Sequence, residues 1–154
     1  MDKSSTDRIE KRIDLKAPIA RVWRALTDHK EFGEWFRVDL DGPFVPGQTT
    51  RGRITYPGYE HLRMEVVVQR MEPEQLFSFQ WYPTAVGPNA DDAKEHPTLV
   101  EFKLDRMGDG TLLRVTESGF DALPPAGRDE AFRRNDDGWT GQMMNIQAYV
   151  TKNP

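Results

Sequence analysis

The sequence contains no cysteine among its 154 residues. This absence excludes disulfide bonds, thiolate nucleophiles, iron–sulfur clusters and cysteine-ligated zinc. The chain also lacks a basic excess, because 21 Lys and Arg stand against 25 Asp and Glu and the formal net charge is −4. Such a protein has no cationic surplus with which to neutralise phosphates, so we expect no nucleic-acid partner.

Long apolar runs are absent as well. No segment approaches the roughly 20 apolar residues of a membrane span, and residues 1–16 are charged throughout, without the apolar core of a signal peptide. We therefore expect a cytoplasmic protein with no membrane span, and the lack of cysteine fits a reducing compartment. The length suits a single domain over residues 1–154, large enough for a real core or a ligand cavity.

The N-terminal part predicts one strand followed by two short helices. Apolar residues alternate with charged ones in Arg8–Leu15, which is typical of a strand with one buried face. In Ile19–Thr27 the apolar residues recur at helical spacing, directly after Pro18, a residue that readily opens a helix. Asp28 is a suitable cap for a second helix over His29–Phe36, which has an aromatic face.

From Gln48 onward the hydrophobic period changes to two. This pattern predicts five more strands, in residues 49–56, 61–70, 76–82, 99–105 and 111–118. Turn residues such as Asp109-Gly110 separate them, so we expect an antiparallel meander. Residues 83–97 are polar, contain three prolines and exceed the length of a hairpin loop, and we interpret them as a mobile flap.

The C-terminal residues 125–150 predict one long helix. Its apolar face is formed by residues at three- and four-residue steps: Phe132, Asn135, Trp139, Met143, Ile146 and Val150. Gly138 lies inside this helix, where glycine costs about 1 kcal/mol relative to alanine. We expect it to allow a close backbone approach or a bend.

Several segments carry a family resemblance that covers residues 8–150. They are residues 16–36, 42–53, 66–81, 110–121 and 135–150. The most specific parts are three short motifs: Ala-Pro-x-x-x-Val-Trp at the first helix, Gly-Phe-Asp after the last strand, and Gly138-Trp139 in the long helix. The chain resembles the SRPBCC (START-like) superfamily, in the branch of the C-terminal domain of the activator of Hsp90 ATPase. The resemblance implies an α+β helix-grip fold, in which a curved antiparallel sheet of about six strands wraps around the long C-terminal helix.

The resemblance also implies a function. Members of the superfamily use a cavity between the sheet and the long helix for hydrophobic molecules, so we expect binding of a small ligand of lipid, polyketide or aromatic type. Two alternatives stay open: a protein-interaction role with a chaperone contact, as in the Hsp90 ATPase activator, and a cyclase or hydrolase acting on a hydrophobic substrate. Fold alone does not choose among them. The aromatic surplus leaves both a monomer and a homodimer possible.

The residues themselves suggest how such a cavity is lined. Large rings and Met side chains pack irregularly and adapt to guests, although the same residues are equally suited to a plain core. Tyr56 shares the parity of Ile54, which would bring its hydroxyl inside, and Asn135 needs a polar partner on its apolar helix face. The expected cavity residues are Trp35, Tyr56, Met64, Phe79, Trp81, Phe102, Asn135, Trp139 and Met143.

Other polar residues are given weaker roles. We expect Arg63 and Glu117 to point outward from the sheet. His29, His61 and His96 lie in three separate segments without metal-ligand spacing, so we expect no metal and no cofactor. We assign no catalytic residue; an enzyme would have to draw on Tyr56, His61 and Asn135, the polar groups nearest to the expected cavity.

Overall fold

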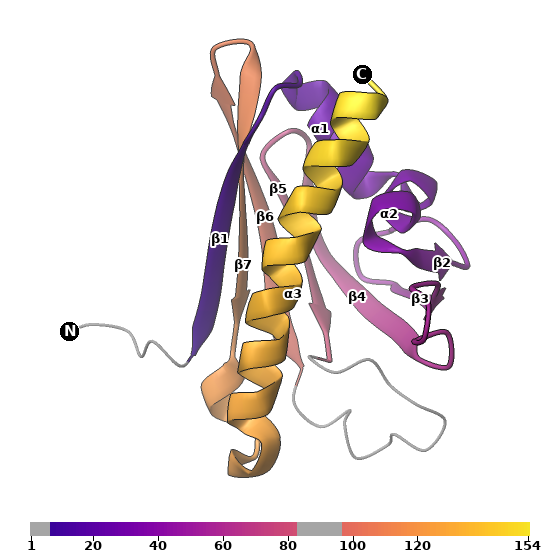
Figure 1. Ribbon diagram of the computed structural model, residues 1–154, viewed down its shortest axis with the longest axis vertical. Coiled ribbons are helices and arrows are strands. Elements are labelled where there is room, and N and C mark those ends of the chain that lie inside the picture. The colour runs from indigo at the N-terminus through magenta and orange to yellow at the C-terminus, as the bar shows by residue number, and fades with distance from the viewer. Residues whose placement is uncertain (1–6, 83–96) are drawn as a thin grey trace, which may run out of the picture.

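The computed structural model describes residues 7–82 and 97–154, and it shows one antiparallel sheet with its helices packed on one face (Figure 1). Within these residues the sheet has seven strands in the order β1-β7-β6-β5-β4-β3-β2. The strands are β1 (Arg8–Leu15), β2 (Val38–Leu40), β3 (Thr49–Ile54), β4 (Arg63–Glu72), β5 (Leu76–Trp81), β6 (Thr98–Met107) and β7 (Gly110–Ser118).

Two short helices follow β1, as the sequence predicts. They are α1 (Ile19–Thr27) and α2 (His29–Phe36), and the Asp28 carboxylate caps α2 by accepting from the backbone N–H of Lys30 at 2.9 Å. Helix α2 lies tightly against β2, and glycine is needed at position 33 because a Cβ there would clash with the Val38 carbonyl oxygen.

Strand β2 is the one strand in the described residues that the sequence pattern missed. It has three residues, Val38–Leu40, which are too few to show alternation. The strand predicted for residues 49–56 ends earlier, at Ile54. The other predicted strands and both short helices are confirmed.

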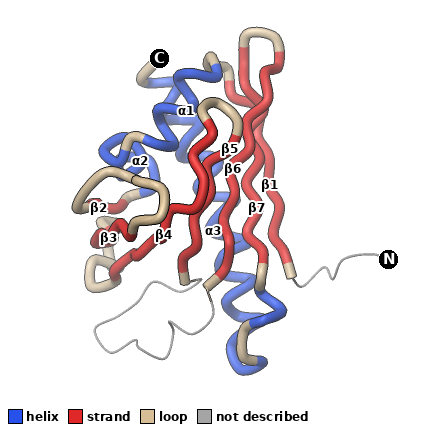
Figure 2. Tube along the Cα trace, turned by 180° about the vertical axis from the view of Figure 1, so that it is seen from behind, coloured by secondary structure: helices blue, strands red, loops and turns tan. Residues whose placement is uncertain are grey.

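The long helix α3 (Pro125–Lys152) crosses the face of the sheet, as views from both sides show (Figures 1 and 2). A short 3-10 turn, η2 (Phe120–Ala122), leads into it. The helix is interrupted near its start at Ala126 and Gly127, where Gly127 has a φ of 86° that favours glycine. The expectation of a bend at Gly138 is wrong, because the non-helical residues are Ala126 and Gly127. The expectation of a close backbone approach at Gly138 is also wrong, because a Cβ there would have no neighbouring heavy atom within 4 Å.

The sheet and α3 together make a helix-grip fold of the α+β class, as the resemblance implies. A shift of register between Val68 and Arg70 introduces a bulge into β4, and bulges bend a strand. The core lies between the bent sheet and the helix, with Phe79 and Phe102 on the sheet and Met143 and Ile146 on α3 all buried.

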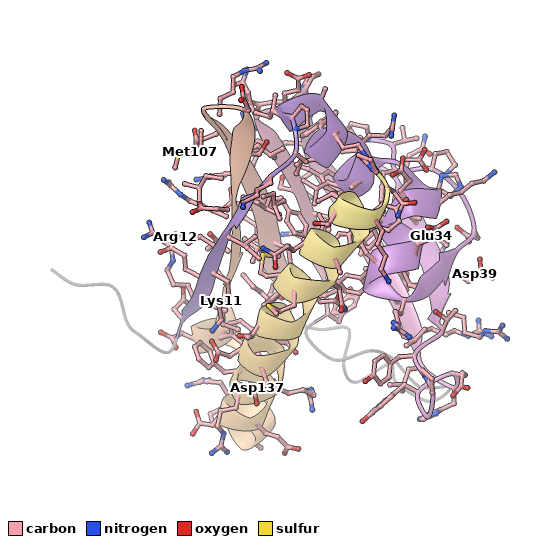
Figure 3. The ribbon with its side chains drawn as sticks, turned by 45° about the horizontal axis from the view of Figure 1, so that its top comes forward. Lys11, Arg12, Glu34, Asp39, Met107 and Asp137 are labelled. Carbon is pink, nitrogen blue, oxygen red and sulfur yellow. The ribbon has the colours of Figure 1, made fainter. Side chains whose placement is uncertain are left out.

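Charged side chains cover the outside. Arg12 on β1, Glu34 on α2 and Asp39 on β2 are exposed and point away from the core (Figure 3). Over the part of the chain that the structure describes, no helix is long and apolar enough to cross a membrane. The predicted flap at residues 83–97 falls outside the described residues, except for Pro97.

Candidate functional site

A cavity of about 410 Å³ lies between the middle of α3 and one end of the sheet. We call it the α3 pocket. Strands β3, β4 and β5, the residues before β4 and the last residue of α2 contribute its other walls. Its lining residues are Phe36, Ile54, Tyr59, Leu62, Arg63, Met64, Glu65, Trp81, Tyr82, Arg134, Asn135, Gly138, Trp139 and Gln142.

Three aromatic rings from distant parts of the chain form one wall. Phe36 ends α2, Trp81 ends β5, and Trp139 lies buried on α3. The ring centroids of Trp81 and Trp139 are 5.6 Å apart, and Phe36 lies 5.9 Å from the first and 6.1 Å from the second. These spacings are those of interacting aromatic pairs, so the three rings make a continuous apolar surface.

A buried carboxylate lies directly behind this wall. Glu117 on β7 is fully buried, and its oxygens accept hydrogen bonds from the indole Nε1 of Trp81 and of Trp139, each at 2.8 Å. Thr98 Oγ1 donates at 2.5 Å, and Asn135 Nδ2 donates to both oxygens at 3.0 and 3.2 Å. The carboxylate therefore fixes the orientation of three pocket-lining side chains at once.

The expectation that Glu117 points outward is wrong. Glu117 follows the alternation of Leu113 and Val115 on β7, so the strand itself turns it inward. Within the described ranges no basic side chain lies at ion-pair distance from this carboxylate. Its charge is instead stabilised by hydrogen bonds from neutral donors, since donors that face an ionised acceptor form strong bonds.

The pocket mouth carries charged and polar groups. Arg63 and Arg134 are exposed lining residues, and Tyr59 is half exposed beside them. Glu65 also lines the pocket, and its carboxylate lies 3.4 Å from the guanidinium of Arg51. Arg63 is exposed as predicted, yet it still borders the pocket because it begins β4 at the end of the sheet.

Four of the predicted cavity residues, Met64, Trp81, Asn135 and Trp139, line the α3 pocket. Four others, Trp35, Phe79, Phe102 and Met143, are buried in the adjoining core and do not line it. Trp35, for example, donates its indole N–H to the Ala25 carbonyl at 2.8 Å. The partner that Asn135 was expected to need is Glu117.

Tyr56 lies outside the pocket, contrary to the prediction. Strand β3 ends at Ile54, so the alternation that would turn Tyr56 inward stops two residues before it. The ring is 51% exposed, packs 5.7 Å from the ring of Tyr59 and lies beneath the guanidinium of Arg37. Its neighbour Tyr59, which sequence reasoning missed, lines the pocket instead.

Sequence reasoning missed most of the rim. Tyr59 lies in a non-periodic turn, and Gln142 lies off the apolar face of α3, where it donates to the Phe36 carbonyl at 3.2 Å. Leu62 falls in the strand predicted for residues 61–70 and Phe36 on the predicted aromatic helix face, but neither pattern indicates that these residues line a pocket. These positions meet only after α2, β4 and α3 pack together.

The two histidines that the structure describes do not form a common site. His61 is exposed and His29 is half-buried on α2, and neither lines the α3 pocket, while His96 falls outside the described residues. Among the residues that the structure describes, no group of His, Asp or Glu side chains is arranged to hold a metal ion. Of Tyr56, His61 and Asn135, the residues an enzyme was expected to use, Asn135 alone borders the pocket.

Comparison with protein families matches residues 16–151 to the family described as activator of Hsp90 ATPase homolog 1-like protein. A search of curated protein sequences finds no significant match.

Solved structures share the fold. The dimer of Aha1 from Colwellia psychrerythraea is 20% identical, with a TM-score of 0.69 over 91% of this chain and 92% of that one. A protein from Arthrobacter aurescens is 14% identical, with a TM-score of 0.81 over 98% and 90%. A protein of the dynemicin biosynthetic locus is 23% identical, with a TM-score of 0.73 over 96% of this chain, which spans 48% of that protein.

Proposed function

Since the chain belongs to the family of activator of Hsp90 ATPase homolog 1-like proteins, within the SRPBCC superfamily, we propose that it binds a small hydrophobic molecule in the α3 pocket. The observation that carries this proposal is the aromatic wall of Phe36, Trp81 and Trp139, which is held open beside a cavity of about 410 Å³. Cavities of this size, mostly apolar with a few polar groups, are typical of small-molecule sites.

The fixed orientation of the aromatic wall favours an open binding cavity over a core in which side chains fill this space. Glu117 holds both indoles by their N–H groups, so the rings cannot rotate into the cavity without breaking buried hydrogen bonds. A ligand that buries about 300 Å² of apolar surface gains about 7 kcal/mol before the costs of association, at about 25 cal/mol per Å².

The first test identifies the molecule. The protein is purified under native conditions and extracted, and the extract is analysed by mass spectrometry. A stoichiometric apolar compound supports the proposal. An empty extract, together with no thermal shift from a panel of apolar compounds, contradicts it.

Gly138 offers a sharper test, because it lines the pocket and has open space where a side chain would grow. We expect Gly138→Leu to fill part of the cavity and weaken ligand binding at least tenfold. Gly141 is the matched control, since it lies on the same helix with equally open space and does not line the pocket. Both substitutions replace a helical glycine and should raise helix stability by several tenths of a kcal/mol.

Isothermal titration with the extracted compound, or with the best compound of the panel, measures the difference. Binding that is lost in Gly138→Leu and kept in Gly141→Leu places the ligand in the α3 pocket. Equal binding by the two variants removes the proposal.

The family description supports a second candidate, a protein-interaction role toward an Hsp90-type chaperone. It is tested by pull-down with the chaperone of the same cell and by the chaperone's ATPase rate. Direct binding with a changed rate supports this role, and the absence of both excludes it. The Gly138→Leu variant separates the two candidates, because filling the pocket should leave a surface contact unchanged.

A further inference from the structure

The α3 pocket is electrically asymmetric. Behind its aromatic wall lies the negative charge of Glu117, fully buried and without a cationic partner among the described residues. At its mouth lie the guanidinium groups of Arg63 and Arg134, both on exposed residues. A bound molecule therefore meets a negative charge on the inner side and positive charges on the outer side.

Among the described lining residues, the basic side chains at the mouth outnumber the acidic ones. The one acidic side chain in that set, Glu65, has its carboxylate 3.4 Å from the Arg51 guanidinium, which offsets its charge. Arg63 has no ion pair with any residue in the described ranges, so its guanidinium has donors available to a ligand. Arg134, one turn before Gly138 on α3, is a second basic lining residue but already has an interaction partner, so Arg63 is the cation that a ligand can use.

The inner side of the pocket disfavours an anionic group. Both oxygens of Glu117 already accept hydrogen bonds, three of them on Oε2 and two on Oε1. The carboxylate has therefore little capacity left to accept from a ligand, while its charge repels an anion that is placed deep in the pocket. The rings of Phe36, Trp81 and Trp139, which are tilted against one another by 33° to 63°, instead offer aromatic faces on which a ring of a ligand can stack.

We propose that the ligand is a planar aromatic anion, with its rings against Phe36, Trp81 and Trp139 and its anionic group at the mouth beside Arg63. This inference rests on the proposed function and narrows it to one ligand class. The anionic group is a carboxylate, a sulfonate or an ionised phenol, since each accepts hydrogen bonds from a guanidinium. A long-chain acyl anion shares the charge but not the flat surface.

The test uses two fluorescent probes that differ by one charged group. 1-Anilinonaphthalene-8-sulfonate is an aromatic anion with a flat naphthalene ring, and N-phenyl-1-naphthylamine is its neutral counterpart. We expect the wild-type protein to bind the sulfonate at least fivefold more tightly than the neutral probe. We also expect dodecanoate, an acyl anion, to displace the bound sulfonate only at concentrations well above the Kd of the sulfonate.

Arg63→Gln should weaken binding of the sulfonate about fivefold and leave the neutral probe unchanged. Arg12→Gln removes the same charge from an exposed position on β1 (Figure 3), a strand that does not line the pocket, and serves as the control. The preference for the sulfonate should also shrink as salt rises from 0.05 to 0.5 M, because salt screens exposed charges.

The outcomes separate this inference from the proposed function. Three results would each overturn the inference that the ligand is an aromatic anion, while leaving the hydrophobic pocket in place. They are equal binding of the neutral and anionic probes, no effect of Arg63→Gln on binding of the sulfonate, and tighter binding of dodecanoate than of the sulfonate. If binding of both probes is the same in Gly138→Leu and Gly141→Leu, the probes do not enter the α3 pocket and the proposed function fails as well.

Discussion

At the scale of single residues, Glu117 is the group on which the pocket wall depends. A carboxylate without a nearby cation is costly to bury unless donors surround it, and here five hydrogen bonds do so. Two of the donors are the indoles that form the wall. The same residue thus affects both the stability of the fold and the shape of the cavity.

Glu117→Gln should lower the free energy of unfolding by about 1–3 kcal/mol, because the amide NH₂ cannot accept and leaves buried donors unpaired. Urea denaturation measures the loss. Glu34→Gln is the control, since Glu34 is exposed on α2 (Figure 3), and it should change the free energy by less than about 0.5 kcal/mol. Equal stability of the two variants would show that the hydrogen bonds to the Glu117 carboxylate do not stabilise the fold.

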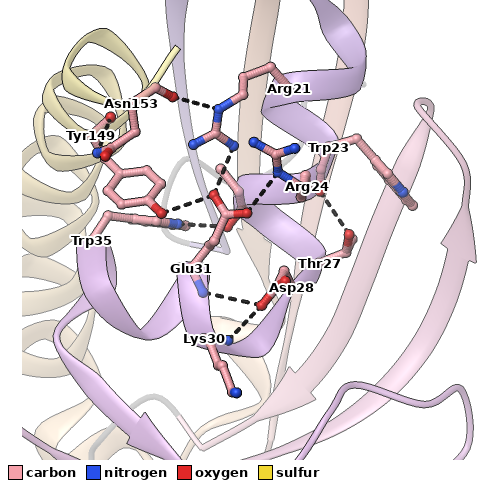
Figure 4. Close-up of polar contacts among 11 residues, drawn as sticks. Arg21, Trp23, Arg24, Thr27, Asp28, Lys30, Glu31, Trp35, Tyr149 and Asn153 are labelled. Carbon is pink, nitrogen blue, oxygen red and sulfur yellow. Dashed lines mark hydrogen bonds and ion pairs between the residues drawn. The ribbon is translucent and has the colours of Figure 1, made fainter.

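At the scale of elements, α3 is held at its C-terminal end by a second polar cluster (Figure 4). Tyr149 donates its hydroxyl to Glu31 Oε1 at 2.9 Å, and Arg21 Nη1 lies 2.8 Å from the same oxygen. This Arg21 contact is an ion pair by distance, while its N–H lacks hydrogen-bond geometry. Arg21 Nε donates to the Asn153 carbonyl at 2.6 Å. The cluster ties α3 to α1 and α2, and so fixes the helix that lines the pocket.

The Tyr149 hydroxyl gives this cluster a pH dependence. Burial, together with the hydrogen bond to Glu31, raises the pKa of Tyr149 to about 12 from its ordinary value of 10.0. The unfolded chain loses this proton near pH 10 and the folded chain keeps it longer. The contribution of Tyr149 to stability is therefore complete below pH 10 and is lost as the pH rises toward 12.

Tyr149→Phe should lower the free energy of unfolding by about 1 kcal/mol at pH 7, through loss of the hydrogen bond. The difference between wild type and variant should shrink between pH 10 and 12, which thermal melts across that range can follow. Tyr56→Phe alters an exposed tyrosine and should not change stability at pH 7. A wild-type advantage that stays constant up to pH 12 would contradict the assignment.

At the scale of the whole molecule, stability is distributed unevenly across the sheet. Strand β7 pairs on both sides, with β1 and β6, and most of its residues are buried. Strand β2 lies at the sheet edge and pairs with β3 through three residues. Local opening needs least free energy where few buried contacts are lost.

Amide hydrogen exchange should therefore be slowest in β6 and β7 and fastest, among the strands, in β2. Mass spectrometry of peptic peptides measures the order. A ligand in the α3 pocket should slow exchange most in the first half of β4 and the middle of α3, which line it, and least in β1, which does not. Protection that is strongest in β1 would place the ligand elsewhere.

Sequence periodicity alone determined the order of the elements, because hydrophobic alternation and helical spacing record which face of each segment is buried. It located six of the seven strands in the described residues and the long helix, and together with the family resemblance it pointed to Met64, Trp81, Asn135 and Trp139 as members of one site. The family resemblance then supplied the way these elements pack.

Tertiary structure alone decided which inward residues border a cavity and which fill the core. Phe79 and Trp81 alternate alike on β5, yet only Trp81 lines the pocket, because Trp81 ends the strand whereas Phe79 lies farther inside it and is fully buried. The partners of Glu117 come from β5, β6 and α3, and no local pattern connects them. Such contacts depend on the distances between elements, and sequence periodicity records only which way each element faces.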